Sequence, residues 1–180
     1  MIIPLFLVLI LSVFEFAFMF NALLSIGHAT RDAALIAAEA GNAGSADCVI
    51  LRAIEDDITA PTSKTRITQV LIYRSDANGT VKNSNTYVRS DSDSTSCTMA
   101  DLSILTVPYK ATATGYPATT RCNIVGGCPN GAPTQPLDTI GVRITYTHNW
   151  VTPLGNFLGS GGGATTTIVQ SNTMRMEPVL

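Results

Sequence analysis

The sequence predicts an α+β fold, in which a long N-terminal hydrophobic α-helix precedes a small, mainly antiparallel β domain. Two observations carry this prediction. Residues 1–26 hold one ionisable side chain, that of Glu15, in a run that is otherwise mostly apolar. The rest of the chain is rich in Thr, Ser, Gly and Val, which favour strands and turns. We therefore expect two units, the helix in residues 1–42 and a β-rich globular domain in residues 43–180.

The N-terminal helix is predicted to cross a membrane. About 20 apolar residues suffice to span a bilayer as a helix, and residues 2–20 supply such a run. An apolar stripe at helical spacing continues to Gly41-Asn42, which predicts one helix of about 40 residues, on the order of 60 Å long. Its first half is apolar on all sides and must therefore be buried in lipid or in protein.

Glu15 is the polar exception within that run. An acidic residue at the centre of a spanning helix costs about 2.5–3.5 kcal/mol on insertion scales. The neighbouring Leu, Ile, Val and Phe residues, at about 0.3–0.6 kcal/mol each, outweigh this cost. Glu15 is then either a tolerated, protonated side chain or a charge that pairs with another chain, and we favour the second interpretation.

The β domain begins with a predicted hairpin. Residues 67–74 and 81–89 read as antiparallel strands, joined by a turn with Asn78-Gly79 at its tip. Residues 139–151 and 165–174 alternate as two further strands of the same sheet. Asn78-Gly79-Thr80 also matches the acceptor sequence for N-glycosylation, so Asn78 is a possible glycan site.

The segments around these strands have weaker patterns. A short second helix is expected from Cys48 onward, with Asp47 as its N-cap, and Glu55 is expected at its solvated end. Residues 102–107 are a candidate strand. Residues 90–100 are expected to form a polar loop, and residues 109–136 an irregular segment.

The four cysteines all follow the apolar helix. If that domain is exported, an even number favours disulfides. The short Gly-containing loop between Cys122 and Cys128 favours a local disulfide. Cys48 and Cys97 then form the second by elimination among three possible connectivities. Four free thiols are the alternative, and zinc is less favoured because CNIVGGC has five residues between its cysteines.

Catalytic and cofactor motifs are scarce in the sequence. It has no phosphate-binding Gly-rich loop, no HExxH and no GxSxG. Asp91, Asp93 and Thr95 occupy the first three ligand positions of an EF-hand loop. However, the sixth position is Ser96 and the twelfth is Leu102, so a solvated loop is favoured over calcium. The net charge of −2 argues against nucleic acid. We expect no enzyme activity, no cofactor and no metal.

The two ends of the chain resemble TadE-like pilins and pseudopilins of the tight-adherence (Tad) branch of type IV pilus systems. At the N-terminus the resemblance lies in Pro4 before a Leu-rich run, the Glu15-Phe16 pair, Asn21, and the small-residue helix with Ala29, Arg31, Asp32 and Ala33. At the C-terminus it lies in the strand with Val142, Ile144 and Tyr146, the VTPLGNFLG segment, and the last strand closing on Met174–Pro178.

This resemblance implies a type IV pilin-like lollipop that polymerises through its N-terminal helix into an extracellular helical filament used in attachment or motility. The implied assembly residues are Pro4, Glu15, Phe16, Phe20 and Asn21. The implied partners are copies of the chain, the cytoplasmic or inner membrane before assembly, prepilin peptidase and the pilus assembly machinery. Family precursors carry a basic leader and an earlier Glu-Phe pair, so we expect Met1 to be the first residue of a processed chain.

In related type IV pilins a helix Glu meets the amino terminus of a neighbouring subunit. Transferring that role to Glu15 requires an axial offset on the order of 21 Å between subunits. The next candidate partners are Ser12, Asn21 or Ser25 of a neighbour. Two other functions remain open: a minor pseudopilin that primes or tips the pilus, and a bitopic membrane protein that presents a β-rich binding module.

Overall fold

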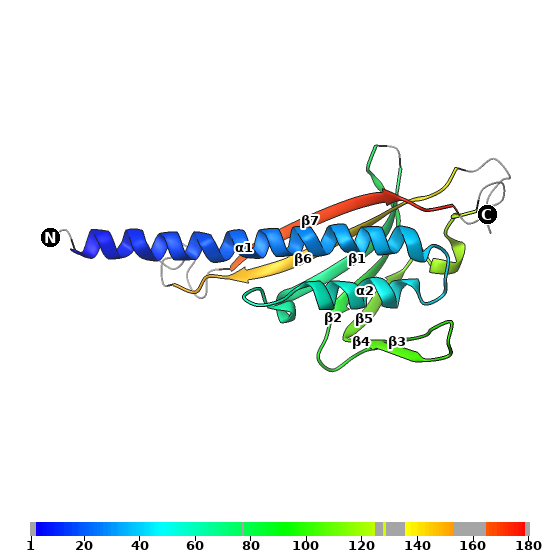
Figure 1. The fold of residues 1–180 in the computed structure, drawn as a ribbon, viewed down its shortest axis with the longest axis horizontal. Coiled ribbons are helices and arrows are strands. Elements are labelled where there is room, and N and C mark those ends of the chain that lie inside the picture. Colours follow the sequence, from blue (N-terminus) through cyan, green and yellow to red (C-terminus); the bar gives the residue numbers. More distant parts are fainter. Residues whose placement is uncertain (1–2, 77, 125–127, 129–135, 153–164, 179–180) are drawn as a thin grey trace.

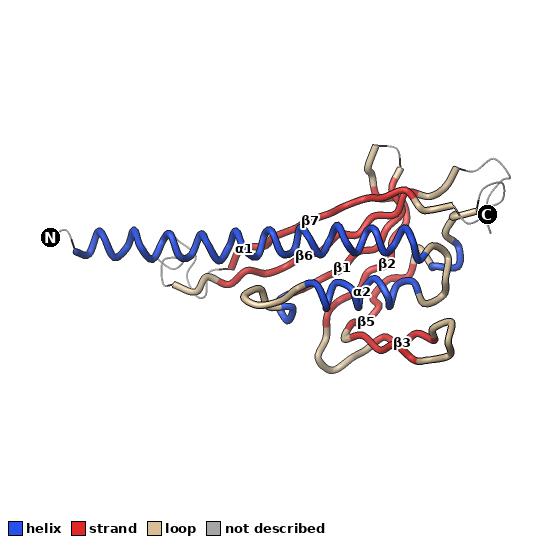
Figure 2. The backbone as a smooth tube through the Cα atoms, in the orientation of Figure 1, coloured by secondary structure: helices blue, strands red, loops and turns tan. Residues whose placement is uncertain are grey.

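The computed structural model describes residues 3–76, 78–124, 128, 136–152 and 165–178. A long helix extends from a head in which two helices lie over one face of a β-sheet (Figures 1 and 2). The elements are α1 (Ile3–Ala40), α2 (Ala46–Asp57), the 3-10 turn η1 (Lys64–Arg66), β1 (Ile67–Ser75), β2 (Val81–Arg89), β3 (Thr95–Thr98), β4 (Ile104–Val107), β5 (Tyr109–Thr114), the 3-10 turn η2 (Ala118–Thr120), β6 (Thr139–Asn149) and β7 (Thr165–Arg175).

Helix α1 is continuous over 38 residues, which confirms the single long helix expected from the apolar pattern. It ends at Gly41, whose φ of +57° places it in the left-handed region. Glycine adopts this conformation at a helix C-terminus without the steric cost of a Cβ. A Cβ there would also overlap the side-chain amide of Asn123. Below, residues 3–20 are called the stalk and the remaining described residues the head.

The main sheet has five strands in the order β5-β2-β1-β6-β7, and every neighbouring pair is antiparallel. The predicted hairpin is confirmed as β1 and β2, with Val70 opposite Tyr87. The two predicted C-terminal strands are confirmed as β6 and β7, in continuous register from Thr139–Arg175 to Asn149–Thr165. The α+β architecture expected from the sequence is therefore correct.

Two segments expected to lack regular structure contain strands. The expected polar loop holds β3, which pairs with β4 in a separate two-stranded sheet. The expected irregular segment begins with β5, which pairs with β2 at the edge of the main sheet. In β5 only Tyr109 is buried, and the next five residues are exposed. With one face out of the core, this strand shows no apolar alternation, which is why the pattern missed it.

Helix α2 lies where it was expected, but its N-terminus differs. Ser45 occupies the N-cap position and makes no side-chain capping bond. Asp47, the predicted N-cap, lies inside the helix, and its residue is 7% exposed. The prediction was wrong because this carboxylate bonds to groups of β2 and of the segment after β5, more than 30 residues away.

Small residues let α1 approach the sheet closely. Ala22, Ala29, Ala33 and Ala37 lie at helical spacing and are at most 2% exposed. They join one core cluster with the sheet, whose inward side chains on β6 are Ile140, Val142, Ile144 and Tyr146. The second half of α1 is thus part of the core of the head, while the stalk extends beyond it (Figure 1).

Candidate membrane and assembly interface

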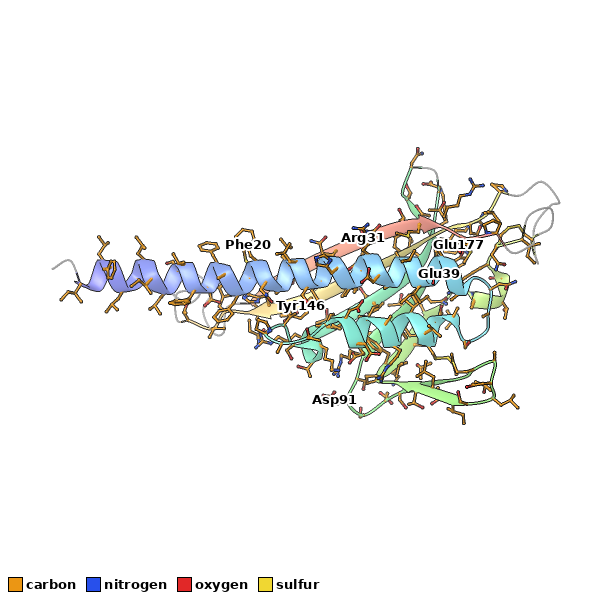
Figure 3. The ribbon with its side chains drawn as sticks, in the orientation of Figure 1. Phe20, Arg31, Glu39, Asp91, Tyr146 and Glu177 are labelled. Carbon is orange, nitrogen blue, oxygen red and sulfur yellow. A yellow bond between two sulfur atoms is a disulfide. The ribbon has the colours of Figure 1, made fainter. Side chains whose placement is uncertain are left out.

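The stalk presents large apolar side chains to its surroundings. Among the described side chains, twelve large apolar residues between Ile3 and Phe20 are exposed. Phe16 is 49% exposed and Phe20 is 57% exposed. Figure 3 shows Phe20 projecting from α1 on the side opposite Tyr146. An apolar surface of this extent marks contact with a membrane or with other protein chains.

Helix α1 is long and apolar enough, by length and composition, to cross a membrane. The segment Leu5–Ala40 reaches a mean hydropathy of 2.3 over its most apolar window, and 11% of that window is buried within the chain. A core helix of a globular protein would be mostly buried. The low burial therefore favours an external apolar environment for the stalk, which lipid or a bundle of helices would provide.

Among the described side chains of the stalk, Glu15 is the buried exception, with 1% of its surface accessible. Its Oε1 accepts a hydrogen bond from the backbone N–H of Val151, and its Oε2 accepts one from the N–H of Thr152, each at 2.8 Å. Nε2 of His148 lies 3.6 Å from Oε1. The carboxylate is thus held by the segment that follows β6, 136 residues later in the chain.

This arrangement corrects the expectation that Glu15 lacks a partner until another chain supplies one. Its two oxygens already accept charge-assisted hydrogen bonds within the same chain, and such bonds are stronger than neutral ones. The sequence could not reveal these hydrogen bonds, because the donors are backbone N–H groups, which do not depend on the type of side chain. A role for Glu15 in assembly stays a prediction. Before any assembly, its carboxylate is already bonded within its own chain.

The other predicted assembly residues divide between the two sides of α1. Phe16 and Phe20 are exposed and free to contact lipid or neighbours. Asn21 is bonded within the chain, since its Oδ1 accepts a hydrogen bond from Oγ1 of Thr62 at 3.1 Å. Pro4 lies in the first turn of α1, as expected. Among the predicted assembly residues whose side chains are described, Glu15 and Asn21 bond within the chain, and Phe16 and Phe20 point outward.

Both expected disulfides are present. Cys48 of α2 is joined to Cys97 of β3, with their Cα atoms 6.1 Å apart, so this bond ties the small two-stranded sheet to the helix layer. Cys122 is joined to Cys128, with a Cα separation of 4.9 Å. Asn78 is exposed beside the β1–β2 turn, where a glycan would be accessible.

Buried ion pairs in the head were not foreseen. Asp47 accepts hydrogen bonds from Nδ2 of Asn85 at 2.7 Å and from the Tyr87 hydroxyl at 2.6 Å, and it pairs with the fully buried guanidinium of Arg121. Burial, and then the neighbouring Asp47 charge, raise the pKa of Tyr87 well above its usual range. This network fastens α2 to the sheet.

A second network corrects the reading of Glu55 as a solvated helix end. Glu55 is 5% exposed, and its Oε1 accepts hydrogen bonds from Nε of Arg89 at 3.0 Å and from the Tyr109 hydroxyl at 2.9 Å. Burial, and then the Glu55 charge, raise the pKa of Tyr109. A buried carboxylate is expected to have such partners, because an unpaired one is costly.

In the loop that begins at Asp91, which was compared with an EF-hand, the carboxylates are paired with cationic side chains. Asp91 lies 2.8 Å from Nη1 of Arg89, and Asp93 lies 3.4 Å from Nζ of Lys110. Across the described parts of the chain, no group of three or more His, Cys, Asp or Glu side chains could hold a metal ion. The contacts of this loop are those of a surface segment stabilised by ion pairs.

Residues 1–35 match the model of the TadE-like protein family. The matched segment contains the whole stalk, Glu15, and much of the helix that packs on the sheet, so the resemblance inferred from this segment is confirmed there. Neither the curated proteins nor the solved structures include a significant match to the chain.

Proposed function

We propose that this protein is a structural pilin subunit of a Tad-like type IV pilus, with no catalytic role. In this proposal it polymerises through α1 into an extracellular helical filament used in surface attachment or motility. The TadE-like match over residues 1–35 supports the association with a Tad system. The observation that carries the subunit role is the stalk, an exposed apolar helix that continues without a break into the folded head.

The energetics of the stalk favour its burial in lipid before assembly and among other helices after assembly. Burying one Leu, Ile or Phe side chain contributes about 1.5–3 kcal/mol relative to exposure in water. With twelve large apolar side chains exposed among those described in the stalk, a free chain in water is strongly disfavoured. Lipid covers this surface before assembly, and the helices of neighbouring copies cover it afterwards. Identical contacts that do not close on themselves generate a helical filament.

The partners follow from this route. The chain lies in the cytoplasmic or inner membrane with its head outside. Prepilin peptidase and the pilus assembly machinery then act on it, and it packs against copies of itself. An oxidising exterior also suits the two disulfides of the head, because disulfides persist in such compartments.

Fractionation of cells tests the proposal. Filaments are sheared from the surface, and the copy number of the chain is measured in the filaments and in the membrane fraction. A structural subunit is the dominant protein of the filament. A trace amount at constant ratio to another subunit would indicate a minor pseudopilin instead. Recovery from membranes alone, in cells that make filaments, would indicate a bitopic protein that presents the head as a binding module.

A further inference from the structure

The end of strand β6 lies alongside the apolar helix. Strand β6 runs past the body of the head next to α1, and the stalk continues beyond it (Figure 1). The contact between Glu15 and the N–H groups of Val151 and Thr152 fixes this placement. Residues 149–152 are called the strand end below.

The level of this contact lies inside the exposed apolar surface of α1. Exposed apolar side chains continue past Glu15 to Leu24, which is 62% exposed. Leu24 lies nine residues further along, about 14 Å at the helical rise. At the level of Glu15 itself, Phe14, Phe16 and Phe18 are each more than 40% exposed. An environment that covers these side chains also surrounds the strand end.

A strand end in an apolar layer has a chemical problem that Glu15 resolves. Backbone N–H groups without a partner are costly in lipid, because no water is there to accept their hydrogen bonds. The N–H groups of Val151 and Thr152 point at the two carboxylate oxygens, so both donors and both oxygens of Glu15 are satisfied together. Without Glu15, this part of the chain would need water.

The side chains of the strand end suit the boundary between lipid headgroups and acyl chains. Val151 is 66% exposed. Trp150 is partly buried and donates its indole N–H to Oγ1 of Thr166 at 2.9 Å. Tryptophan is enriched at this boundary, since its ring is apolar and its N–H is polar.

We propose that, before assembly, the strand end enters the outer part of the membrane beside α1, with Glu15 serving as the internal acceptor that permits this entry. The partner is lipid, at the junction of headgroups and acyl chains. The inference rests on the membrane stage of the proposed function. In this inference Glu15 acts within a single chain, whereas the sequence predicted that it would pair with a second chain.

The experiment uses the single tryptophan of the sequence, Trp150. The full chain is reconstituted into phosphatidylcholine vesicles whose acyl chains carry bromine at defined depths, and Trp150 fluorescence is recorded with bromine or with aqueous acrylamide as quencher. We expect quenching by bromine at shallow acyl positions and protection from acrylamide. Strong acrylamide quenching without bromine quenching, in chains whose stalk is inserted, overturns the inference.

Two variants separate the role of Glu15 from general effects. Glu15→Leu leaves the two N–H groups without an acceptor, so Trp150 is expected to lose bromine quenching and gain acrylamide quenching while the stalk stays inserted. Glu39→Leu, at an exposed Glu of the same helix within the head, is expected to leave both signals unchanged. Unchanged Trp150 depth in Glu15→Leu overturns the role of Glu15.

The outcome is distinguishable from failure of the proposed function. Co-flotation of the chain with vesicles reports insertion of the stalk independently of Trp150. A chain that does not float with vesicles contradicts the membrane stage, and the inference with it. A chain that floats and assembles into filaments, but keeps Trp150 in water, contradicts the inference alone.

Discussion

The stalk and the head place their apolar side chains in opposite ways, although both bury carboxylates. The stalk exposes Leu, Ile, Val and Phe along its length and buries the carboxylate of Glu15. The head buries Ile, Val and Tyr against small alanines of α1, and it also buries Asp47, Glu55, Arg121 and Asp138. Within one continuous helix, the side chains therefore change from a surface for an external partner to a surface for the sheet of the same chain.

The buried charges and the exposed apolar groups have the same explanation. Each side chain lies next to the groups that stabilise it. The buried carboxylates of the head lie within hydrogen-bond distance of Arg or Tyr groups, and the carboxylate of the stalk lies within hydrogen-bond distance of two backbone N–H groups. The exposed apolar side chains find their partners in lipid or in neighbouring copies, as proposed above. Four changes test this comparison, given from the largest expected effect to the smallest.

Removing one member of a buried pair in the head is expected to have the largest effect. Asp47→Ala leaves the Arg121 guanidinium, which is 0% exposed, without its carboxylate. Breaking a buried pair in this way costs about 3–5 kcal/mol of unfolding free energy. Denaturant unfolding, followed by near-UV circular dichroism in detergent, measures the loss. Asp56→Ala on the same helix removes an exposed i,i+4 pair with Arg52 and is expected to cost about 0.5 kcal/mol or less. Equal losses in the two variants would contradict the buried network.

Placing a charge on the stalk is expected to impair its function while sparing the head. Phe16→Glu adds a carboxylate to the exposed apolar surface, at a cost of about 2.5–3.5 kcal/mol for insertion near a helix centre. We expect less chain in the membrane fraction and fewer filaments, with unchanged unfolding of the head. Leu102→Glu, at a residue of the head that is 83% exposed, is the matched control and is expected to change neither. Normal filament yield from Phe16→Glu would show that this face of the stalk contacts neither lipid nor neighbours.

Enlarging a residue on the packed half of α1 is expected to destabilise the head. Ala33 is 0% exposed against the sheet, so Ala33→Leu overpacks this contact at about 1–3 kcal/mol. Leu35→Ala, on the exposed side of the same turn, is expected to stay within about 0.5 kcal/mol of wild type. Thermal unfolding of both variants measures the difference. Equal stability of the two would mean that α1 does not pack on the sheet as described.

The smallest effect concerns a buried hydroxyl. The raised pKa of Tyr109 means that the unfolded chain loses this proton first as the pH rises above about 10, so stability falls with rising pH. Each such tyrosine contributes a slope of about 1.4 kcal/mol per pH unit in that range. In Tyr109→Phe, the alkaline loss of unfolding free energy is therefore expected to be shallower by that amount. An identical alkaline slope in the variant would place this hydroxyl in solvent.

The sequence by itself determined the features that local pattern carries. The uniform apolar run predicts the stalk, and the helical stripe up to Gly41 predicts the full length of α1. Period-2 alternation on both sides of the Asn78-Gly79 turn predicts the β1–β2 hairpin. The same kind of alternation in residues 139–151 predicts β6. The short spacing of Cys122 and Cys128 led to both disulfide pairings. Each of these depends on residues that are close in sequence, or on a count, so no knowledge of the packed fold was needed.

The tertiary structure decided where the charges go. The partners of Glu15 lie 136 and 137 residues later in the chain, and they are backbone groups that any residue type except proline would supply. The buried side chain of Asp47 and the pairing of β5 likewise depend on which segments the sheet brings together. Local pattern gives the propensity of a segment. Only packing places a donor opposite an acceptor, because the energy of a buried charge is set by what surrounds it in space.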